Sequence, residues 1–138
     1  MPGSTELRDY AEIFSLSTGL SQAALSLEKI ANNGTLSPIE VRNLQWTAKL
    51  MGELDWNGPY YRKTGFSAVQ ATMLRPDYFR KLQELRFTPS SDYIMRLYET
   101  MYSGGKNITL STTELETTKK VLKGMSDDLL QQITSGNI

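Results

Sequence analysis

The chain has 138 residues, with 15 Lys or Arg against 15 Asp or Glu, so its formal net charge is zero. This length suffices for one domain with a single hydrophobic core, and the charge balance argues against non-specific binding to nucleic acid or an anionic membrane. The absence of cysteine and histidine excludes disulfides, thiol nucleophiles and imidazole bases, together with most zinc, copper and haem ligand sets.

Targeting and membrane signals are weak. The segment from Met1 to Glu6 has neither a basic start nor an apolar run, and no stretch approaches the roughly 20 apolar residues of a membrane span. We therefore predict a soluble cytoplasmic protein without a cofactor. One helical domain is expected over residues 1–138, with residues 1–4 and 135–138 frayed.

Two amphipathic helices are predicted in the first quarter of the chain, over residues 5–17 and 20–32. The apolar stripe of the first is Leu7, Tyr10, Ala11 and Phe14. The stripe of the second is Leu20, Ala23, Ala24, Leu27 and Ile30. The Ser17-Thr18-Gly19 segment separates the two, unless Gly19 is only a kink within one longer helix.

Two capping boxes mark further helix starts. Ser37 and Glu40 open a helix that extends to Leu54, and Ser111 and Glu114 open one that reaches Ile133. Gly124 and Ser126 are potential breaks in the second of these helices. Its seam of Leu115, Leu122 and Leu129 is expected to pack on the bundle, with a homodimer through the same seam as the alternative.

Three more helices are expected in the middle of the chain. They cover residues 67–74, residues 76–87, and a stretch that begins at Asp92 and ends before Gly104. Residues 106–110 are the only short strand candidate. The predicted fold is therefore an all-α, single-domain bundle of about six or seven short to medium helices with one aromatic-rich loop.

Catalytic signals are scarce. The sequence contains no Gly-x-Ser-x-Gly elbow and no phosphate-cradling glycine loop, and its carboxylate pairs are typical of helix caps or solvated faces. Residues 53–64 begin like a calcium-binding EF-hand loop, but Thr64 occupies the twelfth position, where a bidentate Glu is required. An enzymatic role and a metal site are therefore not expected.

The loop between the two central helices is the strongest binding candidate, because it combines aromatic and basic side chains. Trp, Tyr and Arg are enriched at the energetic centres of protein interfaces, whereas the same aromatics could instead cover the core. The predicted partner-binding residues are Trp56, Tyr60, Tyr61, Arg62, Lys63, Phe66 and Arg75. The sequence thus favours a non-enzymatic, regulatory or adaptor module that binds a protein partner.

Nucleic-acid binding is the alternative function. Residues 59–98 hold seven cations and three anions, a local excess of four positive charges. The cations of the 76–87 helix scatter around its axis. Arg80 and Arg96 each have an acidic residue four positions away, Glu84 and Asp92 respectively, a spacing that predicts ion pairs. This pattern favours solvated helix faces over a continuous basic surface.

Overall fold

The computed structural model describes residues 10–50 and 77–135. It confirms the all-α fold, since these residues contain five helices and no strand, and residues 106–110 form a loop. The helices are α1 (Tyr10–Ala31), α2 (Pro38–Leu50), a helix at residues 77–84, α5 (Tyr93–Tyr102) and α6 (Thr112–Thr134).

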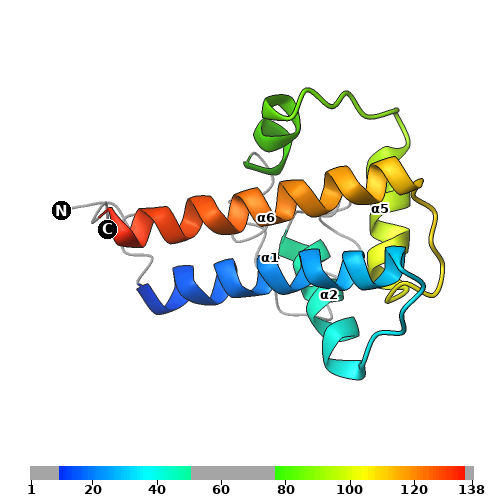
Figure 1. The fold of residues 1–138 in the computed structure, drawn as a ribbon, viewed down its shortest axis with the longest axis horizontal. Coiled ribbons are helices and arrows are strands. Elements are labelled where there is room, and N and C mark those ends of the chain that lie inside the picture. The colour runs from blue at the N-terminus through cyan, green and yellow to red at the C-terminus, as the bar shows by residue number, and fades with distance from the viewer. Residues whose placement is uncertain (1–9, 51–76, 136–138) are drawn as a thin grey trace.

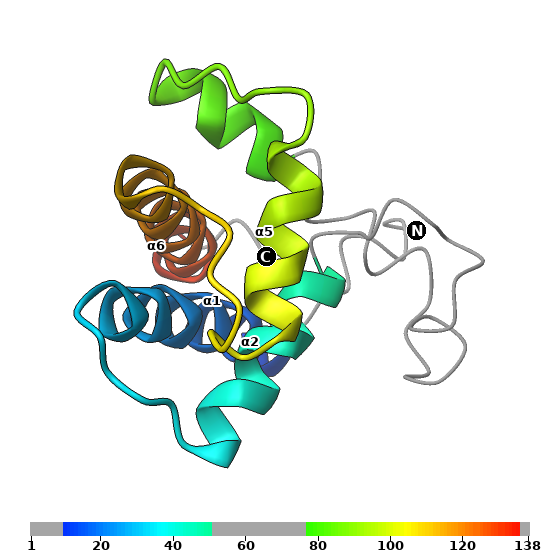
Figure 2. The ribbon, with the colours of Figure 1, turned by 90° about the vertical axis from the view of Figure 1, so that its right-hand side faces the viewer.

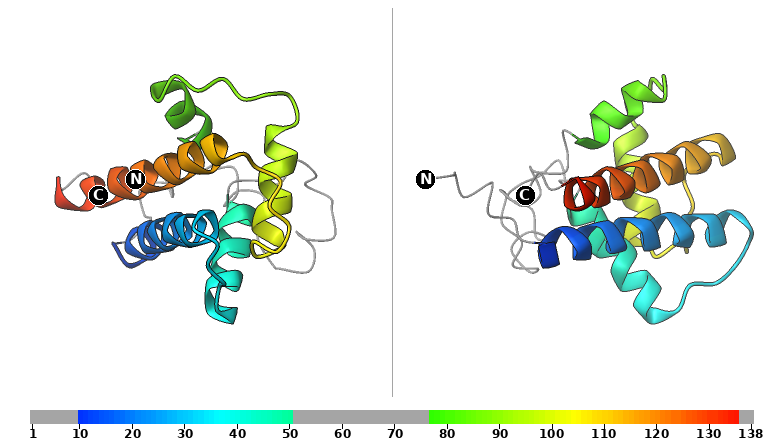
Figure 3. Two further views of the ribbon diagram at one scale, coloured as in Figure 1. Left: turned by 45° about the vertical axis from the view of Figure 1, so that its right-hand side comes forward. Right: turned by 60° about the vertical axis from the view of Figure 1, so that its left-hand side comes forward.

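The two longest helices form the frame of the bundle. Helices α1 and α6 lie antiparallel and side by side along the long axis (Figure 1). Figure 2 shows α2 and α5 on one side of this pair, with the 77–84 helix beside α6. No other described helix lies on the opposite side of the pair, as both views in Figure 3 also show. We call this side the open face of α1 and α6.

The predicted count of six or seven helices is not borne out by the described residues. The proposed break at Ser17-Thr18-Gly19 does not occur, and the predicted 67–74 helix lies outside the described residues. Helix α1 runs through Gly19 without interruption. The ring of Trp46 lies against this glycine so closely that an added Cβ would be 2.4 Å from Trp46 Cζ3. Gly19 therefore serves helix packing, and Trp46 packs on the neighbouring helix.

The predicted stripe at the start of α1 is wrong in phase. Tyr10 and Phe14 are exposed, whereas Ile13 and Leu16 are buried. A continuous helix has a single buried face, and the pattern that ends at Ile30 extends backward to residues 16 and 13. Fusion of the two predicted helices thus moves Phe14 from the expected core to the surface.

Helix α6 is also continuous through Gly124 and Ser126. The seam residues Leu115, Leu122 and Leu129 are buried in the core of the same chain. The seam therefore packs on the bundle, which was the preferred interpretation. The homodimer through these side chains stays a prediction.

Local sequence signals set most helix ends. The box of Ser37 and Glu40 is formed in both directions, with a 2.7 Å bond from Ser37 N to Glu40 Oε1 and a 3.2 Å bond from Glu40 N to Ser37 Oγ. Helices α1 and α5 end at residues in the left-handed conformation, Asn33 with φ of 62° and Gly104 with φ of 65°.

Replacement of Gly19 by Ala should destabilise the fold. Ala normally favours a helix interior by about 1 kcal/mol over Gly, but the new Cβ would overlap Trp46, which we expect to reverse the sign to a net loss of about 1–3 kcal/mol. Urea unfolding measures the difference. Gly124→Ala is the matched control, because its Cβ would meet only the flexible stem of Lys81 at 3.2 Å. Equal effects of the two substitutions would contradict the packing role of Gly19.

Candidate functional site

The predicted partner-binding residues lie outside the described residues. All seven fall within residues 51–76, of which the structure gives no description. The loop therefore stays a prediction, and the description of functional surfaces begins from residues 10–50 and 77–135.

The basic segment of the alternative function is largely paired where it is described. Arg80 pairs with Asp77, three residues before it, and Lys81 contacts both Glu84 at 2.8 Å and Asp128 at 2.7 Å. The pairing of Arg80 with Glu84, which the spacing suggested, does not occur. These carboxylates reduce the positive charge that the described part of the segment offers to a phosphate backbone.

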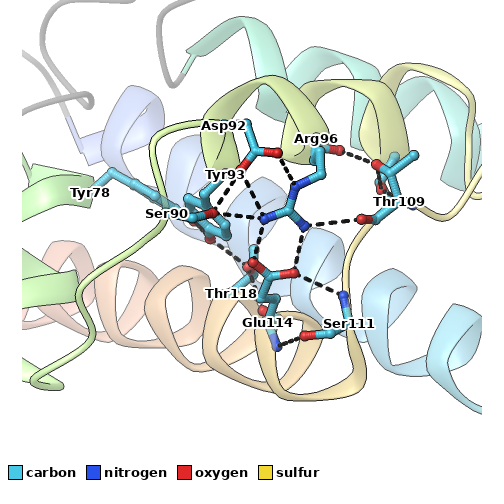
Figure 4. Close-up of polar contacts among 10 residues, drawn as sticks. Tyr78, Ser90, Asp92, Tyr93, Arg96, Thr109, Ser111, Glu114 and Thr118 are labelled. Carbon is cyan, nitrogen blue, oxygen red and sulfur yellow. Dashed lines mark hydrogen bonds and ion pairs between the residues drawn. The ribbon is translucent and has the colours of Figure 1, made fainter.

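Arg96 forms the most connected polar contact among the described residues (Figure 4). Its guanidinium donates two parallel bonds to Glu114, of 2.6 and 2.7 Å. It also contacts Asp92, the N-cap residue of α5, and the main-chain oxygen of Thr109. Sequence spacing predicted the contact with Asp92, but the 18-residue separation concealed the one with Glu114.

Glu114 has a second role in the same place. Its Oε1 accepts the amide hydrogen of Ser111 at 2.9 Å, and Ser111 Oγ accepts the amide hydrogen of Glu114, so the predicted capping box is formed. The Arg96 guanidinium, and secondly the Ser111 amide, hold the pKa of Glu114 down to about 2. One carboxylate thus joins α5 to the first turn of α6.

A chain of buried hydroxyls holds the 77–84 helix to the bundle (Figure 4). The hydroxyl oxygens of Tyr78 and Tyr93 are 2.5 Å apart, and Tyr93 lies 2.6 Å from Thr118 Oγ1. Thr118 donates its own hydrogen to the main-chain oxygen of Glu114. Thr118 must therefore accept from Tyr93, which in turn accepts from Tyr78. Burial raises the pKa of both tyrosines, so both stay neutral donors.

A groove lies between α1 and α6. Its volume is about 560 Å³, and its lining includes two small residues, Ala24 and Gly124. The α6 side carries Lys119, Lys120 and Lys123. Lys119 lies 3.9 Å from Glu28 and 3.0 Å from Glu116, and Lys123 lies 3.1 Å from Asp127.

Large apolar side chains stand along the outer ridge of α1. Phe14 is 60% exposed and Leu25 is 62% exposed, and they share one helical stripe with Thr18 and Ser21. Leu25 borders the α1–α6 groove. Phe14 borders a second hollow of about 420 Å³ between α1 and α2, which Trp46 also lines.

Metal and membrane sites find no support in residues 10–50 and 77–135. Within them, no group of three or more acidic side chains is placed to hold a metal ion. None of the helices in this part of the chain is both long and apolar enough to cross a bilayer. The two acidic pairs at residues 114 with 116 and 127 with 128 are all engaged by cations.

Glu114→Gln should lower stability in a pH-dependent way. Gln keeps the capping box but removes the charge that faces Arg96, so we expect a loss of about 2 kcal/mol at neutral pH. Because folding lowers this pKa from 4.5 to about 2, the stabilisation is complete above the unfolded value and disappears as pH falls toward the folded one. Urea unfolding across this range should show the two proteins converge. Glu116→Gln, which removes a carboxylate charge from the half-exposed pair with Lys119, is the control. A constant difference between Glu114→Gln and wild type at all pH values would contradict the ion-pair role.

The direction of the hydroxyl chain predicts unequal effects for its two tyrosines. Tyr93→Phe leaves the Tyr78 hydroxyl buried without an acceptor, which we expect to cost about 2–3 kcal/mol, whereas Tyr78→Phe removes only the terminal donor and should cost about 1 kcal/mol or less. Thermal and urea unfolding of both variants measure the effects. Equal losses, or a larger loss for Tyr78→Phe, would reverse the inferred direction.

Comparison of this chain with protein-family models, curated proteins and solved structures finds no match. Its function must therefore be argued from its own residues. The open face, with its groove and exposed ridge, is the described surface that best fits a binding role.

Proposed function

We propose that this protein is a small helical interaction module and that the open face of α1 and α6 binds a protein partner. The observation that carries the proposal is the exposure of Leu25, 62%, beside a groove of about 560 Å³. An exposed apolar side chain next to a concave surface lined in part by small residues provides both a projection and a recess. Protein interfaces commonly bury such anchors at their centre.

The composition of the face suits a protein better than a phosphate backbone. Two of its lysines have carboxylates within ion-pair distance, so cations and anions alternate around an apolar centre. A polar rim of mixed charge is typical of protein interfaces, while nucleic-acid surfaces carry a clear positive excess. The loop at residues 56–66 stays a second candidate surface of the same module.

Leu25→Arg should abolish the partner contact without unfolding the protein, because the side chain already faces solvent. The test is affinity capture from the native host with quantitative mass spectrometry, followed by titration of each captured protein in purified form. We expect at least one partner to bind wild type but bind Leu25→Arg about tenfold or more weakly.

Met95→Arg is the matched control, since Met95 on α5 is 60% exposed but lies away from the groove. A partner lost from both variants would point to a general effect of the added charge. If every captured protein binds Leu25→Arg as tightly as wild type, the open face is not the binding surface.

A further inference from the structure

We infer that the open face binds a second copy of this chain, with the two copies related by a twofold axis parallel to α1 and α6. In this arrangement, Leu25 of each copy inserts into the α1–α6 groove of the other. The inference deepens the proposed function and rests on the same face. It names the partner and the geometry, which the proposal of an interaction module leaves open.

The position of Leu25 along the helix pair selects this axis. Leu25 borders the groove of its own chain, so it lies within the length of helix that the groove spans. A twofold axis parallel to the helices keeps each residue at its original position along the helix direction, whereas a perpendicular axis reverses that position. The parallel axis therefore always brings Leu25 level with the partner's groove. A perpendicular axis does so only if it crosses the helices close to Leu25.

Charge on the two sides of the groove is also self-complementary. The α1 side carries Glu28, and the α6 side carries Lys120, which has no ion pair among the described residues. Both line the groove, and the parallel axis places α1 of each copy opposite α6 of the other, so each Glu28 carboxylate faces the side of the partner's groove that carries Lys120. Opposite charges thus meet at both ends of the symmetric contact.

The size of the face predicts a weak dimer. Helix α1 has 22 residues, which corresponds to a length of about 33 Å, and two adjacent helices are about 20 Å wide. The face therefore offers at most about 650 Å² per copy, below the roughly 800 Å² per partner of a standard interface. We expect a dissociation constant on the order of 100 µM.

Sedimentation velocity and equilibrium of the full chain, from about 10 µM to 1 mM, test the inference. Wild type should shift from monomer to dimer over this range, and Leu25→Arg should stay monomeric while Met95→Arg dimerises like wild type. Glu28→Lys and Lys120→Glu should each weaken the dimer about tenfold, and the double variant should recover to within about threefold of wild type. Circular dichroism melts of all variants check that each is folded.

A second experiment tests the orientation of the twofold axis. Carbodiimide cross-linking of an equal mixture of ¹⁴N and ¹⁵N protein should join Glu28 to Lys120 in isotopically mixed peptide pairs, which arise only between chains. Mixed pairs that instead join the Phe14 region of one copy to the Leu25 region of the other would indicate the perpendicular axis and overturn the inference.

The two proposals fail separately. A wild-type chain that remains monomeric at 1 mM overturns the homodimer, and so does a dimer that Leu25→Arg leaves intact. The interaction module would still stand in either case if a different protein binds wild type and loses affinity for Leu25→Arg. It falls only if the capture experiment also shows no dependence on Leu25.

Discussion

The register between α1 and α6 depends on one buried pair of serines. Ser17 Oγ donates to the main-chain oxygen of Ser126 at 2.9 Å, and Ser126 Oγ donates back to that of Ser17 at 2.7 Å. Both side chains are buried, and a slip of α1 along α6 would leave both hydroxyls without acceptors. This exchange fixes which residues of α1 and α6 stand at the same height, including those around the groove. The pattern of residues on the open face therefore follows from this register.

The other end of the bundle depends on Glu114 in a comparable way. A single carboxylate satisfies the first turn of α6 and the guanidinium on α5, so the cap and the tertiary contact reinforce each other. The Tyr93 hydroxyl joins the same turn through Thr118, whose hydrogen goes to the main-chain oxygen of Glu114. Two side chains of α5, Arg96 and Tyr93, thus converge on the first turns of α6. Polar groups there give specificity of arrangement, and the surrounding apolar core supplies most of the stability.

The sequence predicts local features well, because their causes lie within a few residues. Both capping boxes and the left-handed helix end at Gly104 follow from short motifs, and all are present. The contact of Arg96 with Glu114 depends on how α5 and α6 pack, and no helical spacing encodes it. Small residues are ambiguous for the same reason. Gly19 and Ser17 are equally typical of a helix break and of a close helix contact, and only the neighbouring helix decides between the two.

The same ambiguity determines which surface appears functional. If α1 were broken at Gly19, its first half could rotate independently of the second half, and the predicted stripe would bury Phe14 in the core. Because α1 is continuous, the face set by its second half continues through Leu16 and Ile13, and Phe14 and Leu25 fall on a single outer ridge. Gly19 lets Trp46 pack on α1, and the helix continues through this glycine, so the ridge stays in one phase. The continuity of α1 thus determines the apolar pattern on its outer side.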